Sequence, residues 1–205
     1  PLLAEKLSGL AGQLSDDGFT DAVVLGMGGS SMTPLTLRGI FGKPGTGSPG
    51  LRLHALDTVN PASIASVADS LDLSRTLFFV SSKSGTTVEP LSLEAYFRSQ
   101  LSIDAAGSGL SSAGPGRRNF VALTDPGTPM SERARAGEFG TWMATPEDVG
   151  GRFSALSAFG MMPATAAGMD PGRFADAAAR MVQQCLTDST SNPGLQLGAF
   201  MAANA

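Results

Sequence analysis

The chain has 205 residues, 42% of them hydrophobic, and 14 Lys and Arg residues against 18 Asp and Glu residues give a formal net charge of -4. Such a chain can form one domain with its own core, which argues against a disordered or membrane-embedded protein. The acidic balance argues against a nucleic-acid-binding surface, since the one basic pair is Arg117-Arg118.

The first half of the chain alternates helix-like and strand-like segments. Apolar residues spaced three to four positions apart predict helices, and continuous apolar runs predict strands buried on both faces. The expected elements are a helix over 3–14, a strand over 21–26, a helix from 27–30 to about 41, a strand over 51–57, a helix over 61–70 and a strand over 75–81. We expect Pro34 in the first turn of its helix and a Gly-rich, Pro-rich loop over 43–50.

The second half continues this alternation and then becomes helical. The expected elements are a helix over 90–101, a mobile loop over 104–116, a strand over 119–124, a helix over 130–136, a strand over 141–144, and helices near 154–161, 171–186 and 193–205. Strands separated by helices predict an α/β fold, a three-layer αβα sandwich with a five-stranded parallel, doubly wound sheet and a helical C-terminal segment. We expect a single domain over 1–205.

The stretch from Ser81 to Glu89 connects the third predicted strand to the following helix. It places the hydroxyls of Ser82, Ser84, Thr86 and Thr87 beside a helix start, where unpaired N–H groups and the helix dipole favour an anion. Ser and Thr also cap helices, which is the alternative. Four hydroxyls, a Lys and a Gly within six positions exceed the needs of a cap, so we predict a phosphate site.

Two further motifs follow predicted strands, and ligands of parallel sheets bind at the carboxyl ends of strands. The first is Gly26-Met27-Gly28-Gly29-Ser30-Ser31, and the second is Gly150-Gly151-Arg152-Phe153-Ser154. The first lacks the G-x-G-x-x-G spacing of a dinucleotide site. Its glycines either let the backbone approach a ligand closely or form an ordinary tight turn, and both interpretations stay open.

Three motifs occur in this order: Met27-Gly28-Gly29-Ser30, Ser82-Lys83-Ser84-Gly85-Thr86-Thr87-x-Glu89, and Gly150-Gly151-Arg152-Phe153-Ser154-x-x-Ser157. In order and spacing they resemble the glucose-6-phosphate isomerase family. The resemblance covers nearly the whole chain and matches the first of that family's two sugar isomerase (SIS) domains. The Ser-Lys-Ser-Gly-Thr-Thr form is closest to the bacterial branch, some of whose members are fused to a transaldolase, because the animal enzymes have Ser-Lys-Thr-Phe-Thr-Thr.

The resemblance implies reversible conversion of glucose 6-phosphate to fructose 6-phosphate through ring opening and a cis-enediol, a step of glycolysis and gluconeogenesis. No metal or organic cofactor is implied. The residues implied to bind the substrate are Gly29, Ser30, Ser82, Lys83, Ser84, Thr86, Thr87 and Gly151, and those implied to act in catalysis are Arg152 and Glu89. Arg152 would stabilise the enediolate charge as the C2 proton leaves.

Some of these residues have simpler interpretations. Outside this motif set, Arg152 would be interpreted as a structural salt-bridge residue. Glu89 has two interpretations: it contacts the sugar ring, or its charge merely favours the helix start. His54, the single histidine, alternates with apolar residues on a strand and is expected to be a satisfied histidine at the edge of the sheet. Asp125 precedes Pro and Gly, as in an Asx turn.

In the family, a Glu moves the proton and a His and a Lys assist ring opening, and all three follow the first domain. The His comes from a neighbouring subunit. We therefore expect this chain to be a piece of a longer protein, without the second SIS domain, that binds sugar phosphate but does not isomerise it by itself. The full-length protein is expected to be a homodimer that acts on a small sugar phosphate and not on a nucleic acid or a membrane.

Two other classes stay open, a SIS-domain sugar-phosphate sensor and another SIS aldose-ketose isomerase such as phosphomannose isomerase. The sensor would keep the phosphate turn without needing Arg152, so the Gly-Gly-Arg-Phe-Ser motif argues against it. The single cysteine, Cys185, cannot form an internal disulfide, which favours a cytoplasmic protein. We expect this thiol to be buried on the apolar face of its helix.

Overall fold

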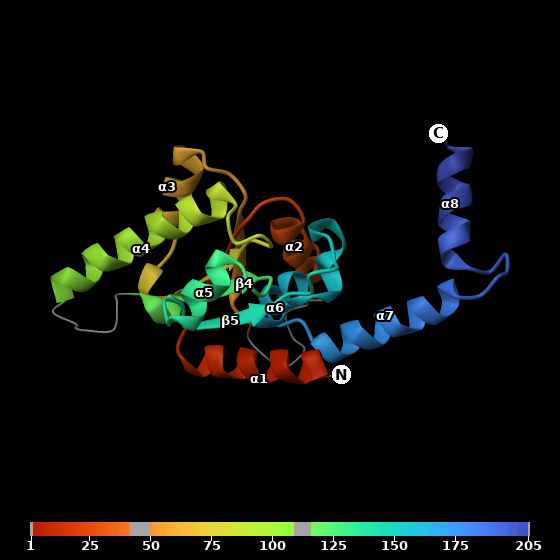
Figure 1. Cartoon of the computed structure of the whole chain (residues 1–205), viewed down its shortest axis with the longest axis horizontal. Coiled ribbons are helices and arrows are strands. Elements are labelled where there is room, and N and C mark those ends of the chain that lie inside the picture. The colour runs from red at the N-terminus through yellow and green to blue at the C-terminus, as the bar shows by residue number, and fades with distance from the viewer. Residues whose placement is uncertain (1, 42–49, 109–115, 205) are drawn as a thin grey trace.

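A computed structural model describes residues 2–41, 50–108 and 116–204. A five-stranded sheet in the order β2-β1-β3-β4-β5 forms its centre, and every neighbouring pair of strands is parallel (Figure 1). The strands are β1 (Asp21–Gly26), β2 (Arg52–Leu56), β3 (Thr76–Ser81), β4 (Phe120–Thr124) and β5 (Thr141–Ala144). The predicted parallel, doubly wound sheet is confirmed.

Helices connect the strands and continue beyond the last one. They are α1 (Leu2–Asp16), α2 (Gly29–Phe41), α3 (Pro61–Asp69), α4 (Val88–Ser108), α5 (Pro129–Arg135), α6 (Ala158–Ala166), α7 (Pro171–Cys185) and α8 (Pro193–Ala203). Short 3-10 helices occur at η1 (Leu73–Arg75), η2 (Arg117–Asn119) and η3 (Gly151–Leu156).

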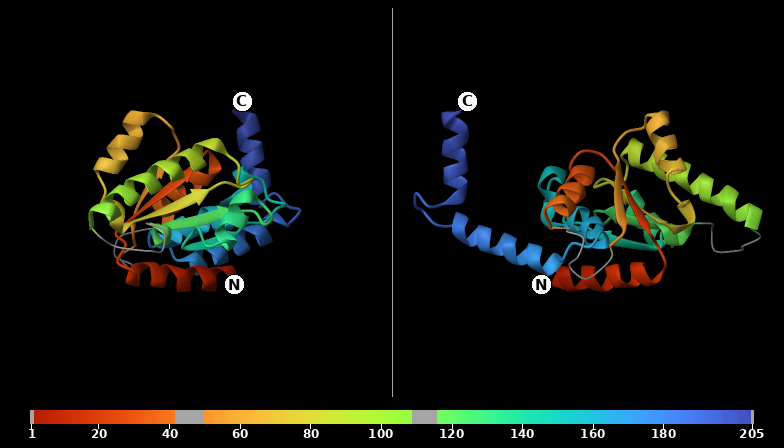
Figure 2. Two further views of the ribbon diagram at one scale, coloured as in Figure 1. Left: turned by 60° about the vertical axis from the view of Figure 1, so that its left-hand side comes forward. Right: turned by 180° about the vertical axis from the view of Figure 1, so that it is seen from behind.

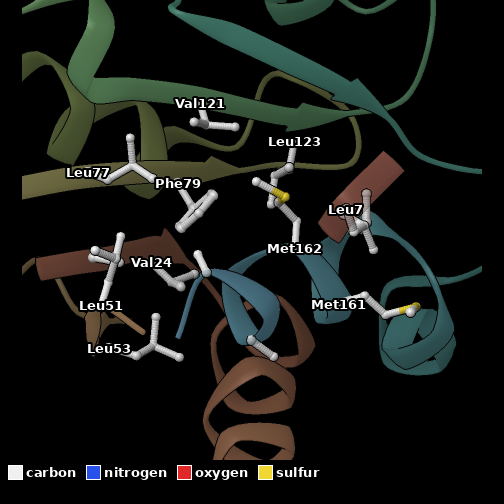
Figure 3. Packing of buried hydrophobic residues seen from close by; sticks show 14 of the residues in the cluster. Leu7, Val24, Leu51, Leu53, Leu77, Phe79, Val121, Leu123, Met161 and Met162 are labelled. Carbon is white, nitrogen blue, oxygen red and sulfur yellow. The ribbon is translucent and has the colours of Figure 1, made fainter. Parts of the chain in front are cut away.

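The two faces of the sheet are covered by different helices (Figure 2). Every residue of β1, β3 and β4 is buried, as their continuous apolar sequences require. Side chains of α1, α2 and α6 pack on one face, where Leu7, Met161 and Met162 belong to the same buried cluster as Val24 and Phe79 (Figure 3). Side chains of α3, α4 and α5 pack on the other face. The predicted three-layer αβα sandwich is therefore confirmed.

The strand order creates one switch point, between β1 and β3. From β1 the chain crosses through α2 to β2 on one side, whereas β3, β4 and β5 follow one another on the other side. Connections that leave neighbouring strands in opposite directions open a crevice at their carboxyl ends, and such crevices bind ligands in doubly wound folds. Gly26 and Ser81, the last residues of β1 and β3, are register partners at this point.

Two predictions about helix α2 and helix α4 are wrong in detail. Pro34 lies inside α2, beyond its first turn, so it removes the N–H that would bond to the carbonyl of Ser30. Helix α4 continues through Ser108, because Ala105 and Ala106 maintain the helix where a loop was predicted from 104. The predicted loop segments at 43–49 and 109–115 lie outside the described residues.

The predicted helix near 154–161 is two elements. Helix η3 ends at Leu156, and α6 then begins at Ala158 with Ser157 as its cap. The Ser157 hydroxyl accepts a hydrogen bond from the amide of Phe159 at 3.3 Å. A capping serine in the middle of the apolar run thus marks the boundary that spacing alone did not reveal.

Helices α7 and α8 extend away from the sheet as an arm (Figure 1). The prediction that Cys185 is buried is wrong, because the end of α7 leaves the body and the thiol is exposed. Within the described ranges, no helix is long and apolar enough to cross a membrane.

Candidate functional site

The turn between β3 and α4 is organised by its own hydroxyl groups. The Ser82 hydroxyl donates to the Thr87 hydroxyl at 3.0 Å and accepts from the Thr87 amide at 3.4 Å. The Ser84 and Thr86 hydroxyls are paired at 2.9 Å, and the Thr86 amide donates to the Ser84 hydroxyl at 3.3 Å. Ser82 is buried, whereas Ser84 and Thr86 are exposed. The turn therefore presents a fixed set of hydroxyl groups at the surface.

Helix α4 begins at this turn with unpaired amide groups. Val88 and Glu89 are its first residues, so the helix offers their N–H groups no acceptor, and among the described residues none is supplied from elsewhere. The positive end of the helix dipole adds to them. Glu89 is half-buried, and within residues 2–41, 50–108 and 116–204 its carboxylate has no hydrogen-bond or ion-pair partner. Hydroxyls and unpaired amides therefore lie together at the start of α4, an arrangement that favours an anion.

Gly85 fixes the turn against the start of α5. Its φ of +66° is a left-handed conformation that a side chain disfavours, and a Cβ there would lie 2.8 Å from the Cβ of Thr128. Thr128 in turn caps α5, accepting from the Ser131 amide at 3.1 Å. The motif therefore requires glycine at this position for two independent reasons.

The Gly-rich turn after β1 contacts the segment that carries the arginine. A Cβ added to Gly29 would lie 2.6 Å from the carbonyl oxygen of Gly151 and 3.4 Å from the Cα of Arg152. The close approach seen here is to another backbone segment, a contact that neither sequence interpretation of the turn included. Ser30 is half-buried in the first turn of α2. The first and third motifs are thus neighbours.

Arg152 and Phe153 are exposed, and Phe153 has 81% of its surface accessible. Across the described part of the chain, the Arg152 guanidinium makes no hydrogen bond or ion pair. The two serines of the motif are buried and fold the backbone, because the Ser154 hydroxyl donates to the Gly151 carbonyl at 2.6 Å and the Ser157 hydroxyl to the Ser154 carbonyl at 2.7 Å. The motif therefore displays an unpaired cation on a fixed backbone.

Lys83 lies in the hydroxyl turn, but its ammonium group contacts other parts of the protein. It forms an ion pair with Asp125 and donates to the carbonyls of Pro146 and Glu147, each at 3.0 Å. The other oxygen of Asp125 accepts from the Thr145 hydroxyl. Interpreting Asp125 as an Asx-turn residue is therefore wrong, because its carboxylate binds side chains from two other loops.

His54 lies in the middle of the edge strand β2, and its ring contacts the amino end of β1, as expected for a satisfied histidine at the edge of the sheet. Its ring lies 3.1 Å from the buried carboxylate of Asp21, which also accepts from Arg52 at 2.8 Å and Thr20 at 2.9 Å. Burial opposes the charged form of Asp21, yet these hydrogen bonds outweigh it and lower its pKa. This cluster is structural and far along β1 from the site.

The structure thus gathers the predicted residues at the switch point between β1 and β3. The sequence interpretation missed Asp125, Thr128 and Thr145, which hold the site's loops; Asp125 and Thr145 do follow strands, a signal that could have indicated them. No group of three or more His, Cys, Asp or Glu side chains in the described segments could hold a metal ion.

Comparison with known proteins adds a family to this geometry. A family model described as phosphoglucose isomerase matches residues 5–196. A glucose-6-phosphate isomerase from Rubrobacter xylanophilus is 31% identical over 198 residues, which are 94% of this chain and 44% of that protein. One from Thermus thermophilus is 36% identical over 150 residues, 73% of this chain and 33% of that protein.

Solved structures agree with these matches. The structure of a glucose-6-phosphate isomerase from Chlamydia trachomatis superposes with a TM-score of 0.74 at 29% identity, covering 92% of this chain and 34% of that one. A hypothetical protein from Thermus thermophilus gives a TM-score of 0.82 at 29% identity, covering 98% of this chain and 45% of that one. The chain therefore spans less than half the length of the relatives that it matches.

Proposed function

Because the chain belongs to the phosphoglucose isomerase family, we propose that it is a single SIS-type domain forming the sugar-phosphate site of a glucose-6-phosphate isomerase. The observation that carries the proposal is the convergence of hydroxyls, free amides and an unpaired arginine at one switch point. A phosphate ester needs oriented donors, and an enediolate needs a fixed cation. The site offers oriented donors and an arginine held on a fixed backbone.

The phosphate group would occupy the start of α4. The exposed hydroxyls of Ser84 and Thr86 would donate to its oxygens together with Thr87, while buried Ser82 holds Thr87 in place through two hydrogen bonds. The first amides of α4 would supply further hydrogen-bond donors to the phosphate oxygens. Hydrogen bonds to a charged oxygen contribute about 1.5–3 kcal/mol each, so the phosphate would dominate the affinity.

Gly29, Ser30 and Gly151 would line the sugar, next to Arg152. In the isomerisation the C2 proton of the open-chain aldose leaves to a base, and negative charge develops on the C1 oxygen as the enediolate forms. A proton then passes from the C2 hydroxyl to the C1 oxygen, and a proton is returned to C1 to give the ketose. A guanidinium near these oxygens stabilises the charge and stays cationic at every working pH. Arg152, which has no partner in the part of the chain that the structure describes, is available for this role.

The step also needs a base. Glu89 is a carboxylate at the site that has no partner among the described residues, whereas His54 is held by Asp21 at the other end of β1. The family resemblance assigns proton transfer to groups beyond this domain, and Glu89, which it places among the catalytic residues, would act by contacting the sugar ring. We therefore propose that this chain binds sugar phosphate and that turnover requires the longer protein.

The full-length enzyme would be a cytoplasmic homodimer acting in glycolysis and gluconeogenesis. The free thiol of Cys185 fits a reducing compartment. Dimerisation is proposed from the family, in which the neighbouring subunit completes the active site.

Calorimetric titration with fructose 6-phosphate, beside fructose, tests the proposal. We expect binding that requires the phosphate and that weakens at least about tenfold in a Ser84→Ala/Thr87→Ala double variant. The control is Ser92→Ala/Ser99→Ala, two exposed serines further along α4. If the Ser84→Ala/Thr87→Ala variant binds as tightly as the parent, the turn is only a helix cap and the assignment of the phosphate site is overturned.

A further inference from the structure

The ammonium group of Lys83 has no donor left for a ligand. A lysine ammonium carries three N–H donors and no acceptor. In this structure it has three acceptors, which are one carboxylate oxygen of Asp125 and the carbonyl oxygens of Pro146 and Glu147. Direct binding of phosphate by Lys83 would require breaking at least one of these contacts.

These contacts join three loops that are distant in sequence. Lys83 belongs to the turn after β3, Asp125 follows β4, and Pro146 with Glu147 follows β5, at separations of 42, 63 and 64 residues. The backbones of the first two loops are also linked, since the Asp125 amide donates to the Lys83 carbonyl at 3.2 Å. We call this set the Lys83 clamp.

The segment held by the clamp leads directly to the arginine. Residues 145–150 connect β5 to η3, and Arg152 is the second residue of η3. Because Arg152 has no hydrogen bond of its own among the described residues, its backbone alone determines where the guanidinium can reach. That backbone is held on one side by contact with Gly29 and on the other by the clamp.

We propose that Lys83 is a positioning residue, which acts through Asp125 to hold the segment 145–150 and thereby Arg152 relative to the phosphate turn. This role rests on the proposed function. It differs from direct phosphate binding in a measurable way. Loss of the Lys83 clamp would weaken the binding of ligands that reach both the turn and Arg152. Loss of a lysine that contacts phosphate directly would weaken the binding of any phosphate.

The test titrates this chain with fructose 6-phosphate and with inorganic phosphate, in the parent, Lys83→Met, Asp125→Asn and the double variant. The clamp predicts that both single variants lose about tenfold affinity for fructose 6-phosphate and keep inorganic phosphate within about threefold. Because both changes break the same unit, the double variant should be no weaker than the weaker single variant. Amide hydrogen exchange over residues 145–152 should accelerate in all three.

The control variant is Lys6→Met, which removes an exposed lysine from α1 and should bind both ligands like the parent. If Lys83→Met fails to fold, Thr145→Val replaces it in the test. This variant keeps the ion pair but removes the hydroxyl that donates to Asp125, and it should show the same pattern of affinities with smaller changes. A Lys83→Met variant that loses inorganic phosphate while Asp125→Asn keeps it would establish direct contact and overturn the clamp.

The two proposals fail in different ways. A parent chain that binds no fructose 6-phosphate overturns the proposed function. A parent that binds it, with single variants that keep parental affinity and parental exchange over 145–152, overturns the positioning role alone.

Discussion

The two ends of strand β1 lie beside arginines in different surroundings. At the amino end, buried Asp21 is bonded to Thr20, Arg52 and His54. At the carboxyl end, the Gly-rich turn contacts the backbone of η3, and Arg152 has no partner among the described residues. One arginine neutralises a carboxylate of the fold, and the other is free for an anionic ligand.

The difference separates stability from function. Polar groups that are satisfied within the protein stabilise it, and their loss is felt on unfolding. Groups that stay unpaired at a crevice contribute little to folding and are available for binding. Substitutions at the two ends of the sheet should therefore divide into those that change stability and those that change affinity.

The largest loss of stability is expected from Gly85→Ala. Its φ of +66° disfavours a side chain, and the new Cβ would lie 2.8 Å from Thr128, so unfolding by urea should show a loss of about 2–4 kcal/mol. Gly127→Ala is the matched control, because Gly127 has a φ of +74° but nothing within 4 Å of an added Cβ. It should lose about 1 kcal/mol. Equal losses of stability in the two variants would mean that Gly85 does not pack against the start of α5.

Gly29→Ala comes next, with an expected loss of about 1–3 kcal/mol and weaker binding of fructose 6-phosphate. The added Cβ would lie 2.6 Å from the Gly151 carbonyl oxygen and would push η3 away from α2. Gly39→Ala in the same helix has nothing within 4 Å and should gain stability. A Gly29→Ala chain with parental stability and affinity would contradict the packing of the two motifs.

Asp21→Asn should cost about 1–2 kcal/mol without changing affinity for sugar phosphate. The lowered pKa of Asp21 means that its contribution is complete above its ordinary pKa of 3.8 and is lost as the pH falls through the lower folded-state value. Unfolding free energies measured against pH should therefore differ between parent and variant by a constant amount near pH 7 and converge below about pH 4. A difference that grows on acidification would contradict the assignment.

Arg152→Gln should have the smallest effect on stability, within about 0.5 kcal/mol, since the side chain is exposed and unpaired. Its effect should appear in titration, as about tenfold weaker binding of fructose 6-phosphate. Arg173→Gln, an exposed arginine on α7, is the control. A loss of stability in Arg152→Gln would mean that the guanidinium supports the fold.

Local sequence was sufficient to predict most elements. The strands at 21–26 and 141–144 have the predicted bounds, because their apolar runs end at Gly or polar residues. The order β2-β1-β3-β4-β5 could not be predicted, since strand pairing depends on contacts between distant segments. The end of α4 was misplaced because Gly and Ser around the alanines suggested a loop.

The site divides in the same way. Hydroxyls before a helix and Gly-rich turns after strands are local signals, so the positions of Ser84, Thr86 and Gly29 could be predicted. The partners of Lys83 could not, because they lie 42 or more residues away and two of them are backbone carbonyls, which no residue type reveals. The sequence indicated the groups of the proposed site better than the contacts that hold them.

The most direct test of the account follows backbone amide resonances of this chain during titration with fructose 6-phosphate. The account predicts changes at 27–30, 84–89 and 150–153, where the carboxyl ends of the strands converge, and none at Asp21 or His54. Changes centred on the amino end of the sheet or on α7, with the amides of Val88 and Glu89 unmoved, would contradict it.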